Sequence, residues 1–158
     1  SLGGLPMIYS GDEIGMPNNY DYLQDETKQF DNRWLHRSKM NWDVVASFSE
    51  TESAASRIYT QLKHFIAIRK ATPAFADSND LEFIDASNTH LLVYKKTAAT
   101  GAPVYVIVNF SEFDTVFERA TLPPFVDNKA HDLITGRVIA LEASHFISAY
   151  DVLWLQEV

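Results

Sequence analysis

Apolar residues follow several different spacings along the 158-residue chain, and the first is a short continuous run near its start. The run, Leu5 to Tyr9, is followed by Gly11 and by two carboxylates, Asp12 and Glu13. This order is typical of a buried strand in a parallel sheet. We therefore predict a strand over residues 1–9, with ligand-facing side chains after its carboxyl end, where parallel α/β folds place their sites.

A long polar segment comes next and shows no regular apolar spacing. Gly15 to Asn32 is rich in Asn, Asp, Tyr and Gln, and Arg33 to Trp42 continues it. Long loops without periodicity are often functional. Trp34 and Trp42 are either ligand anchors or packing residues, and packing is the commoner role of a large aromatic side chain.

Helical spacing begins after residue 52. Ser53 to Thr72 carries apolar residues on one helical face, with a plausible cap at Ser53, cations in the last turn and Pro73 directly after it. We predict one helix here. The apolar face is formed by Ile58, Leu62, Phe65 and Ile66.

From Leu81 onward the spacing is that of strands. His90–Lys95 and Pro103–Phe110 are rich in β-branched and aromatic residues and are joined through Thr100-Gly101. Gly136 marks a tight turn. Shorter strands are predicted at Asp114–Arg119, Ala130–Ile134, Arg137–Leu141 and Tyr150–Gln156. Short strands without intervening helices favour an antiparallel β-sandwich or Greek-key module.

Composition and charge narrow the class of protein. The formal net charge of −8 argues against a nucleic-acid partner, and the absence of Cys excludes disulfides and Cys-based metal sites. No signal peptide and no run long enough for a transmembrane helix is visible. We expect a cytoplasmic location away from the membrane, with secretion left open. A chain that begins inside an apolar strand is expected to be the C-terminal part of something longer.

Two motifs resemble the α-amylase superfamily (glycoside hydrolase family thirteen). Gly4-Leu5-Pro6-x-Ile8-Tyr9-x-Gly11-Asp12-Glu13 resembles the last strand of its barrel. Leu23-Gln24-Asp25, followed by Asp31-Asn32-Arg33-Trp34-x-His36-Arg37, resembles the amylosucrase branch more closely. One position departs from the pattern, since Ser38 stands where Pro is expected; Pro fixes φ and Ser does not.

The resemblance implies a mostly β chain that begins with the last strand and helix of a (β/α)8 TIM barrel. Residues 1–76 would end the catalytic barrel, and residues 77–158 would form an antiparallel β-sandwich (Greek-key) C-terminal domain. The catalytic carboxylates of the superfamily lie on earlier strands, so this chain is expected to contain no catalytic residue and to be inactive alone. Asp12 and Glu13 are adjacent, which suits structural hydrogen bonding better than bracketing a glycosidic bond.

Arg33 is the candidate substrate-binding residue. The resemblance implies that an Arg at this position pairs with an Asp from an early barrel loop and closes the floor of the glucosyl pocket. A guanidinium can hold a carboxylate bidentately and still donate to sugar hydroxyls. The alternative is a local ion pair with Asp31 or Asp25, and a structural role is expected for His36 and Arg37.

Other groups of residues give only weak indications of a metal, glycosylation or sugar-binding site. The acidic loop residues lack the spacing of a calcium loop, and the histidines lack metal-ligand spacing, so no metal or cofactor is expected. Asn109-Phe110-Ser111 matches a glycosylation sequon, but we interpret it as the end of a strand, since sequons are common by chance. Phe110, Trp154 and the tyrosines of the β-domain are expected in the core rather than on a sugar-binding platform.

The resemblance therefore implies part of a retaining, amylosucrase-like enzyme that converts sucrose to α-glucan and fructose. Sucrose and α-glucan would bind with the help of the barrel outside this chain, and the isolated piece is expected to self-associate through apolar faces. Three alternatives stay open. They are an α-glucosidase, α-amylase or sucrose hydrolase of the same superfamily, a non-catalytic carbohydrate-binding β-sandwich, and a purely structural interaction domain.

Overall fold

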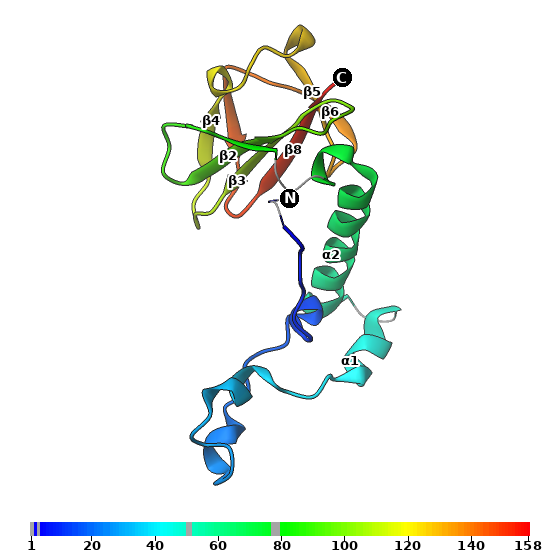
Figure 1. Cartoon of the computed structure of the whole chain (residues 1–158), viewed down its shortest axis with the longest axis vertical. Helices are drawn as coiled ribbons and strands as arrows, with labels where there is room; N and C mark the ends of the chain where they lie inside the picture. Colours follow the sequence, from blue (N-terminus) through cyan, green and yellow to red (C-terminus); the bar gives the residue numbers. More distant parts are fainter. Residues whose placement is uncertain (1, 3, 50–51, 77–79) are drawn as a thin grey trace. The chain divides into compact units, whose positions relative to one another are not determined.

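The computed structural model describes residue 2 and residues 4–49, 52–76 and 80–158 (Figure 1). The chain forms two compact units. One contains Ser1–Leu5 and Phe65–Val158, and the other contains Pro6–His64. The predicted domain boundary after residue 76 falls beside residues 77–79, which lie outside the described part, and it stays a prediction. Within the described residues, no helix is both long and apolar enough to cross a membrane.

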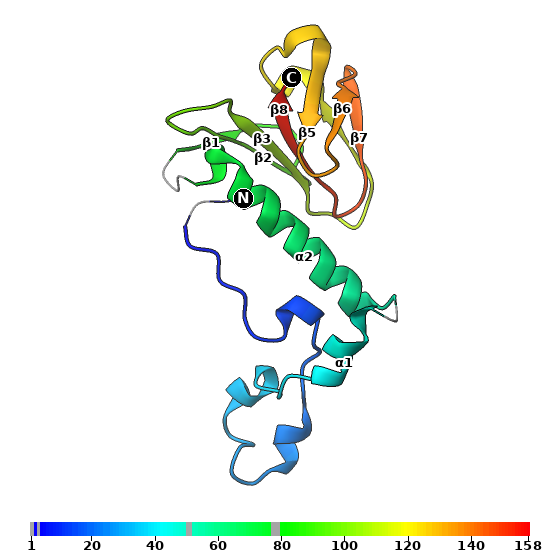
Figure 2. The ribbon, with the colours of Figure 1, turned by 90° about the vertical axis from the view of Figure 1, so that its right-hand side faces the viewer.

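The larger unit is built on a six-stranded sheet in which every neighbouring pair is antiparallel, in the order β1-β2-β3-β8-β5-β6 (Figure 2). Strands β4 and β7 pair separately. The strands are β1 Leu81–Ile84, β2 Leu91–Lys96, β3 Val104–Asn109, β4 Thr115–Glu118, β5 Lys129–Asp132, β6 Arg137–Ala140, β7 Ser144–Ile147 and β8 Val152–Glu157. All six strands predicted between residues 90 and 156 are present, and β1 and β7 were not predicted. The mostly β, antiparallel character is therefore confirmed and is consistent with a β-sandwich.

The six-stranded sheet is covered on both faces. Successive residues of β3 alternate between two clusters, with Tyr105 and Ile107 in one and Val104 and Val106 in the other. The first cluster includes residues of β4 and β7, and the second includes Phe65 and other side chains from the end of α2 and the following turn. Burial on both faces explains why β3 reads as a continuous apolar run instead of an alternating one.

Helix α2 extends over Ala54–Ala71, as predicted. Its start is a reciprocal cap: the Ser56 amide donates to Ser53 Oγ (3.1 Å), and the Ser53 amide donates to Ser56 Oγ (3.0 Å). Thr72 and Pro73 follow its last residue, and Pro73 opens a short 3-10 helix, Pro73–Phe75. The predicted N-cap role of Ser53 is confirmed.

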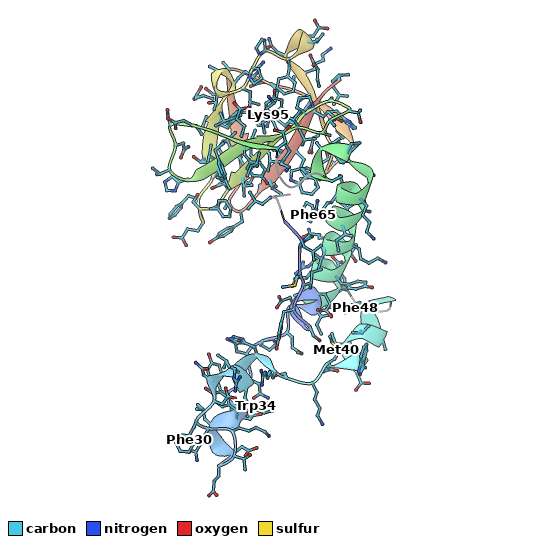
Figure 3. All side chains as sticks on the ribbon, in the orientation of Figure 1. Phe30, Trp34, Met40, Phe48, Phe65 and Lys95 are labelled. Carbon is cyan, nitrogen blue, oxygen red and sulfur yellow. The ribbon has the colours of Figure 1, made fainter. Side chains whose placement is uncertain are left out.

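The smaller unit consists mainly of turns and short helices. Its elements are the 3-10 helices η1 Asp12–Ile14, η2 Asp21–Gln24, η3 Asn32–His36 and η4 Ser47–Ser49, the short helix α1 Trp42–Ala46, and the first part of α2. Figure 3 draws the side chains as sticks and labels Phe30 and Trp34, which belong to the polar segment that follows Gly15. The predicted loop character of Gly15 to Asn32 is confirmed, apart from η2.

The strand predicted over residues 1–9 is wrong for this structure. None of the residues described between 2 and 9 lies in a strand, and Leu5 and Met7 are 89% and 88% exposed. A strand needs backbone partners in a neighbouring strand, and the apolar run has no such neighbour in the described part of the chain. Local composition can mark a strand-forming segment but cannot provide its partner.

Candidate functional site

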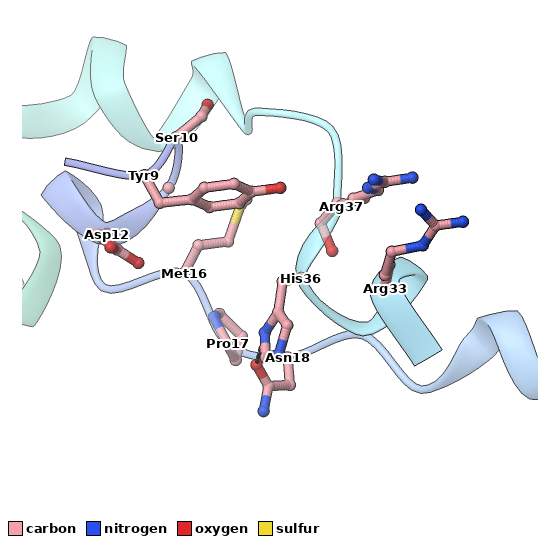
Figure 4. A pocket seen from close by; sticks show the side chains of 11 residues that line it. Tyr9, Ser10, Asp12, Met16, Pro17, Asn18, Arg33, His36 and Arg37 are labelled. Carbon is pink, nitrogen blue, oxygen red and sulfur yellow. Dashed lines mark hydrogen bonds between the residues drawn. The ribbon is translucent and has the colours of Figure 1, made fainter. Parts of the chain in front are cut away.

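The smaller unit contains a pocket of about 420 Å³ that lies between two segments of the chain (Figure 4). The first segment follows the apolar run, and the second contains η3 and the residues after it. Each segment includes residues of a motif that carried the resemblance, Tyr9, Gly11 and Asp12 in the first and Arg33, His36 and Arg37 in the second. The lining residues are Tyr9, Ser10, Gly11, Asp12, Met16, Pro17, Asn18, Arg33, His36, Arg37 and Ser38.

Hydrogen bonds hold the two segments together. The Asn19 amide donates to the Leu35 carbonyl at 2.9 Å. His36 Nδ1 lies 3.0 Å from Asn18 Oδ1, the contact drawn in Figure 4; because an amide oxygen only accepts, the ring donates through Nδ1. Asn18 was not identified as a site residue from the sequence. Asn18 follows Pro17 and contacts His36, 18 residues further along the chain, and no local sequence pattern indicates that contact.

Arg33 is tied to Asp31, the local alternative that the sequence left open. Its Nε and Nη2 donate to the two carboxylate oxygens of Asp31, each at 2.8 Å, and its amide donates to Oδ1 at 3.0 Å. The Arg33 side chain lowers the pKa of the Asp31 carboxyl, and Asp31 raises the pKa of Arg33. Asp31 also caps η3. It therefore fixes both the backbone and the guanidinium of Arg33, and three of the five N–H groups stay available.

A second guanidinium, that of Arg37, also lines the pocket. Its carbon lies 5.5 Å from the centroid of the Trp34 ring, and Lys28 Nζ lies 5.3 Å from the same centroid. No ion pair includes Arg37 within residues 4–49, 52–76 and 80–158. Trp34 is partly buried, whereas Trp42, for which an anchoring and a packing role were both left open, is 71% exposed.

The adjacent carboxylates play different parts. Glu13 Oε2 accepts the Gly11 amide at 2.8 Å, so the predicted structural hydrogen bonding is confirmed for Glu13. Asp12 is the single carboxylate among the described residues that line the pocket. Retaining cleavage of a glycosidic bond uses two carboxyl groups on either side of the sugar. The lining set therefore suits binding of a hydroxyl-rich ligand better than its cleavage.

Several other sequence predictions are settled by the position of their residues. Asn109 of the sequon is fully buried at the end of β3, so the strand-end interpretation is confirmed. Trp154 is buried, as expected, but Phe110 and Tyr150 are 64% and 70% exposed, and their predicted core position is wrong. Both follow or precede a strand, where the chain leaves the core. No group of three His or carboxylate side chains suited to a metal occurs among the described residues.

Comparisons with known proteins show what the fold is similar to. No protein-family model matches the chain. Among solved structures, an inactive mutant of MutB, a trehalulose synthase, in complex with isomaltulose is 22% identical with a TM-score of 0.67, over 98% of this chain and 36% of that one. An Anoxybacillus α-amylase is 15% identical with a TM-score of 0.63, over 100% of this chain and 30% of that one.

A third similar structure is AmyP with maltotriose, which is 17% identical with a TM-score of 0.55, over 68% of this chain and 22% of that one. The chain thus spans about a third or less of the length of these proteins. At such identities the similarity concerns the fold. The chain shares its fold with part of these enzymes, among them a trehalulose synthase and an α-amylase.

Proposed function

We propose that the chain is the C-terminal part of a retaining, α-glucosyl-transferring enzyme that is amylosucrase-like and uses sucrose. The observation that carries this proposal is that residues of both resemblance motifs line one pocket. The fold similarity to MutB, which was solved in complex with sucrose, supports a sucrose-active relative.

The role proposed for this chain is to bind the glucosyl unit of the donor. Arg33 has N–H groups left after pairing with Asp31, and such groups donate well to sugar hydroxyls. Asp12, Asn18 and His36 add acceptors and donors to the same lining. The remaining barrel would provide the nucleophile and the acid/base, and the glucosyl unit would pass through a covalent intermediate to a glucan with retention.

The isolated chain is proposed to be inactive, because its pocket offers one carboxylate where retaining chemistry needs two. Leu5 and Met7 are almost fully exposed, and Ile58 of the predicted helix face is 40% exposed. Apolar side chains in such positions favour packing against further chain elements. Without those elements the piece is expected to self-associate, which light scattering over a concentration series would detect.

One observation favours a second candidate function within the superfamily. Structures similar to this chain include an α-amylase and AmyP bound to maltotriose, so an enzyme that acts on α-glucans is the main rival. A non-catalytic sugar-binding β-sandwich is the rival of another class, and the exposed Phe110 and Tyr150 are the side chains that would serve it.

The test uses the native polypeptide from its source cells, incubated with sucrose while free fructose and free glucose are followed together. Fructose well in excess of glucose, with accumulating glucan, is the expected result. Equal amounts would replace transfer with sucrose hydrolysis. Release of neither sugar, together with maltotriose cleavage, would favour the α-glucan-active rival.

A further inference from the structure

The two guanidinium groups of the pocket are in different states, although both side chains project from the same short segment (Figure 4). The Arg33 guanidinium donates two of its N–H groups to the Asp31 carboxylate, and this ion pair has no net charge. Arg37 makes no ion pair with any residue that the structure describes. Arg37 therefore contributes the larger set of open donors.

The contact between Arg37 and Trp34 leaves those donors open. An aromatic ring attracts a cation that lies over it through its electron-rich face and offers no oxygen acceptor there, whereas a guanidinium carries five N–H donors. With the guanidinium carbon 5.5 Å from the ring centroid, Trp34 can support Arg37 without competing for its hydrogen bonds. Pairing with a carboxylate, as Asp31 does with Arg33, would instead occupy one edge.

The backbone explains why these two side chains meet. Arg37 follows η3, and its amide donates to the Trp34 carbonyl at 3.2 Å, which continues the 3-10 pattern. Side chains three residues apart are eclipsed in a 3-10 helix, so Arg37 comes to lie over Trp34. The ring is held in turn by Lys28, which also forms an ion pair with Asp25.

We infer that Arg37 is a second sugar-binding residue of the pocket, whose guanidinium edge donates to adjacent hydroxyl groups of the ligand. Trp34 is a positioning residue that acts through Arg37. A neutral sugar is the ligand that suits the site, because Asp12 lies in the same lining and the chain is acidic overall. This inference rests on the proposed function for the identity of the sugar.

The test is an NMR titration of the 158-residue chain with sucrose and, separately, with maltotriose. Arg37 Nε–H and the Trp34 ring resonances should shift together with one saturation curve. Arg37→Met should weaken the affinity about tenfold or more, since hydrogen bonds from a charged donor are strong. Trp34→Leu should weaken it about two- to fivefold, and Trp34→Phe, which keeps a ring face, by less.

A double variant separates positioning from general structural damage. If Trp34 acts through Arg37, Trp34→Leu should add no further loss of affinity in the Arg37→Met background. Arg137→Met is the matched control, since Arg137 is an exposed arginine of β6 in the other unit. Additive losses, an affinity unchanged by Arg37→Met, or no shift at Arg37 with either sugar would overturn the inference.

Sucrose turnover by the native full-length enzyme distinguishes this inference from the proposed reaction. Binding through Arg37 without sucrose turnover would remove the proposed reaction and keep Arg37 as a sugar-binding residue. Turnover that is unchanged by Arg37→Met would remove the inference and keep the proposed reaction.

Discussion

Replacing Asn109 is the sharpest test of how the β unit is held together. This residue ends β3 and is fully buried. Its Nδ2 donates to the carbonyls of Phe113 (2.8 Å) and Ser148 (2.9 Å), and its Oδ1 accepts from the amide (2.9 Å) and the hydroxyl (2.7 Å) of Ser111. The side chain therefore joins the turn after β3 to the turn before β8.

The cost of Asn109→Ala follows from these bonds. Four short hydrogen bonds at about 0.5–1.5 kcal/mol each, partly recovered by water in the opened turn, give a loss of about 3–4 kcal/mol in the free energy of unfolding. With a urea m-value of about 2 kcal/mol/M, the midpoint of unfolding should fall by about 1.5–2 M. Asn109→Asp keeps the acceptor but loses the donors, so it should cost a comparable amount at neutral pH.

The assay is urea unfolding followed by far-UV circular dichroism, with Asn32→Ala as the control at an exposed asparagine. The control should change stability by no more than about 0.5 kcal/mol. A midpoint for Asn109→Ala within about 0.3 M of the parent chain, at an unchanged m-value, would refute the role given to this side chain.

Further predictions concern the pH response, the helix cap and one glycine. Hydrogen bonds from Lys28 and Thr27 lower the pKa of Asp25 to about 2. The contribution of this carboxylate to stability is therefore present above about pH 4 and is lost as the pH falls through 2. A ¹³C titration of the carboxyl group should show a midpoint near 2, and Lys28→Met should raise that midpoint. Ser53→Ala should cost about 1 kcal/mol of unfolding free energy, measured thermally, because the helix loses its cap; no change would contradict the cap geometry. Gly15→Ala should lower the free energy of unfolding by at least about 1 kcal/mol, since φ is +61° and the new Cβ would lie 2.5 Å from Ile58 Cδ1. In Gly136→Ala the new Cβ would meet open space, so this substitution should cost only the backbone strain.

The elements that were predicted correctly are those specified by local chemistry. The apolar spacing, cap and terminal Pro73 define α2 without reference to the rest of the chain. Strand β3 is a run of β-branched and aromatic residues, and Gly136 gives the turn between β5 and β6. Strands β1 and β7 were missed because each has only four residues and contains polar ones, Glu82 in β1 and Ser144 and His145 in β7.

The parts that were missed or predicted wrongly depend on partners elsewhere in the chain. Leu5 to Tyr9 has the composition of a strand, but a strand forms only beside another strand. The Arg33–Asp31 pair could be foreseen because its members are two residues apart, while the contact of Asn18 with His36 joins segments that no local pattern relates. Phe110 looked like a core residue because its neighbours are apolar, yet it lies just beyond the end of β3.

We propose that residues of the two motifs form a pocket that binds the glucosyl unit through Arg33. The most direct measurement is the steady-state kinetics of sucrose turnover by the native full-length enzyme and its Arg33→Lys variant, with Arg137→Lys as the control. A lysine keeps the charge but cannot hold Asp31 bidentately and donate to the sugar at once. The account predicts at least about a tenfold loss of kcat/KM for Arg33→Lys at an unchanged Tm, and unchanged kinetics for the control. Equal kcat/KM for the variant and the parent enzyme would contradict it.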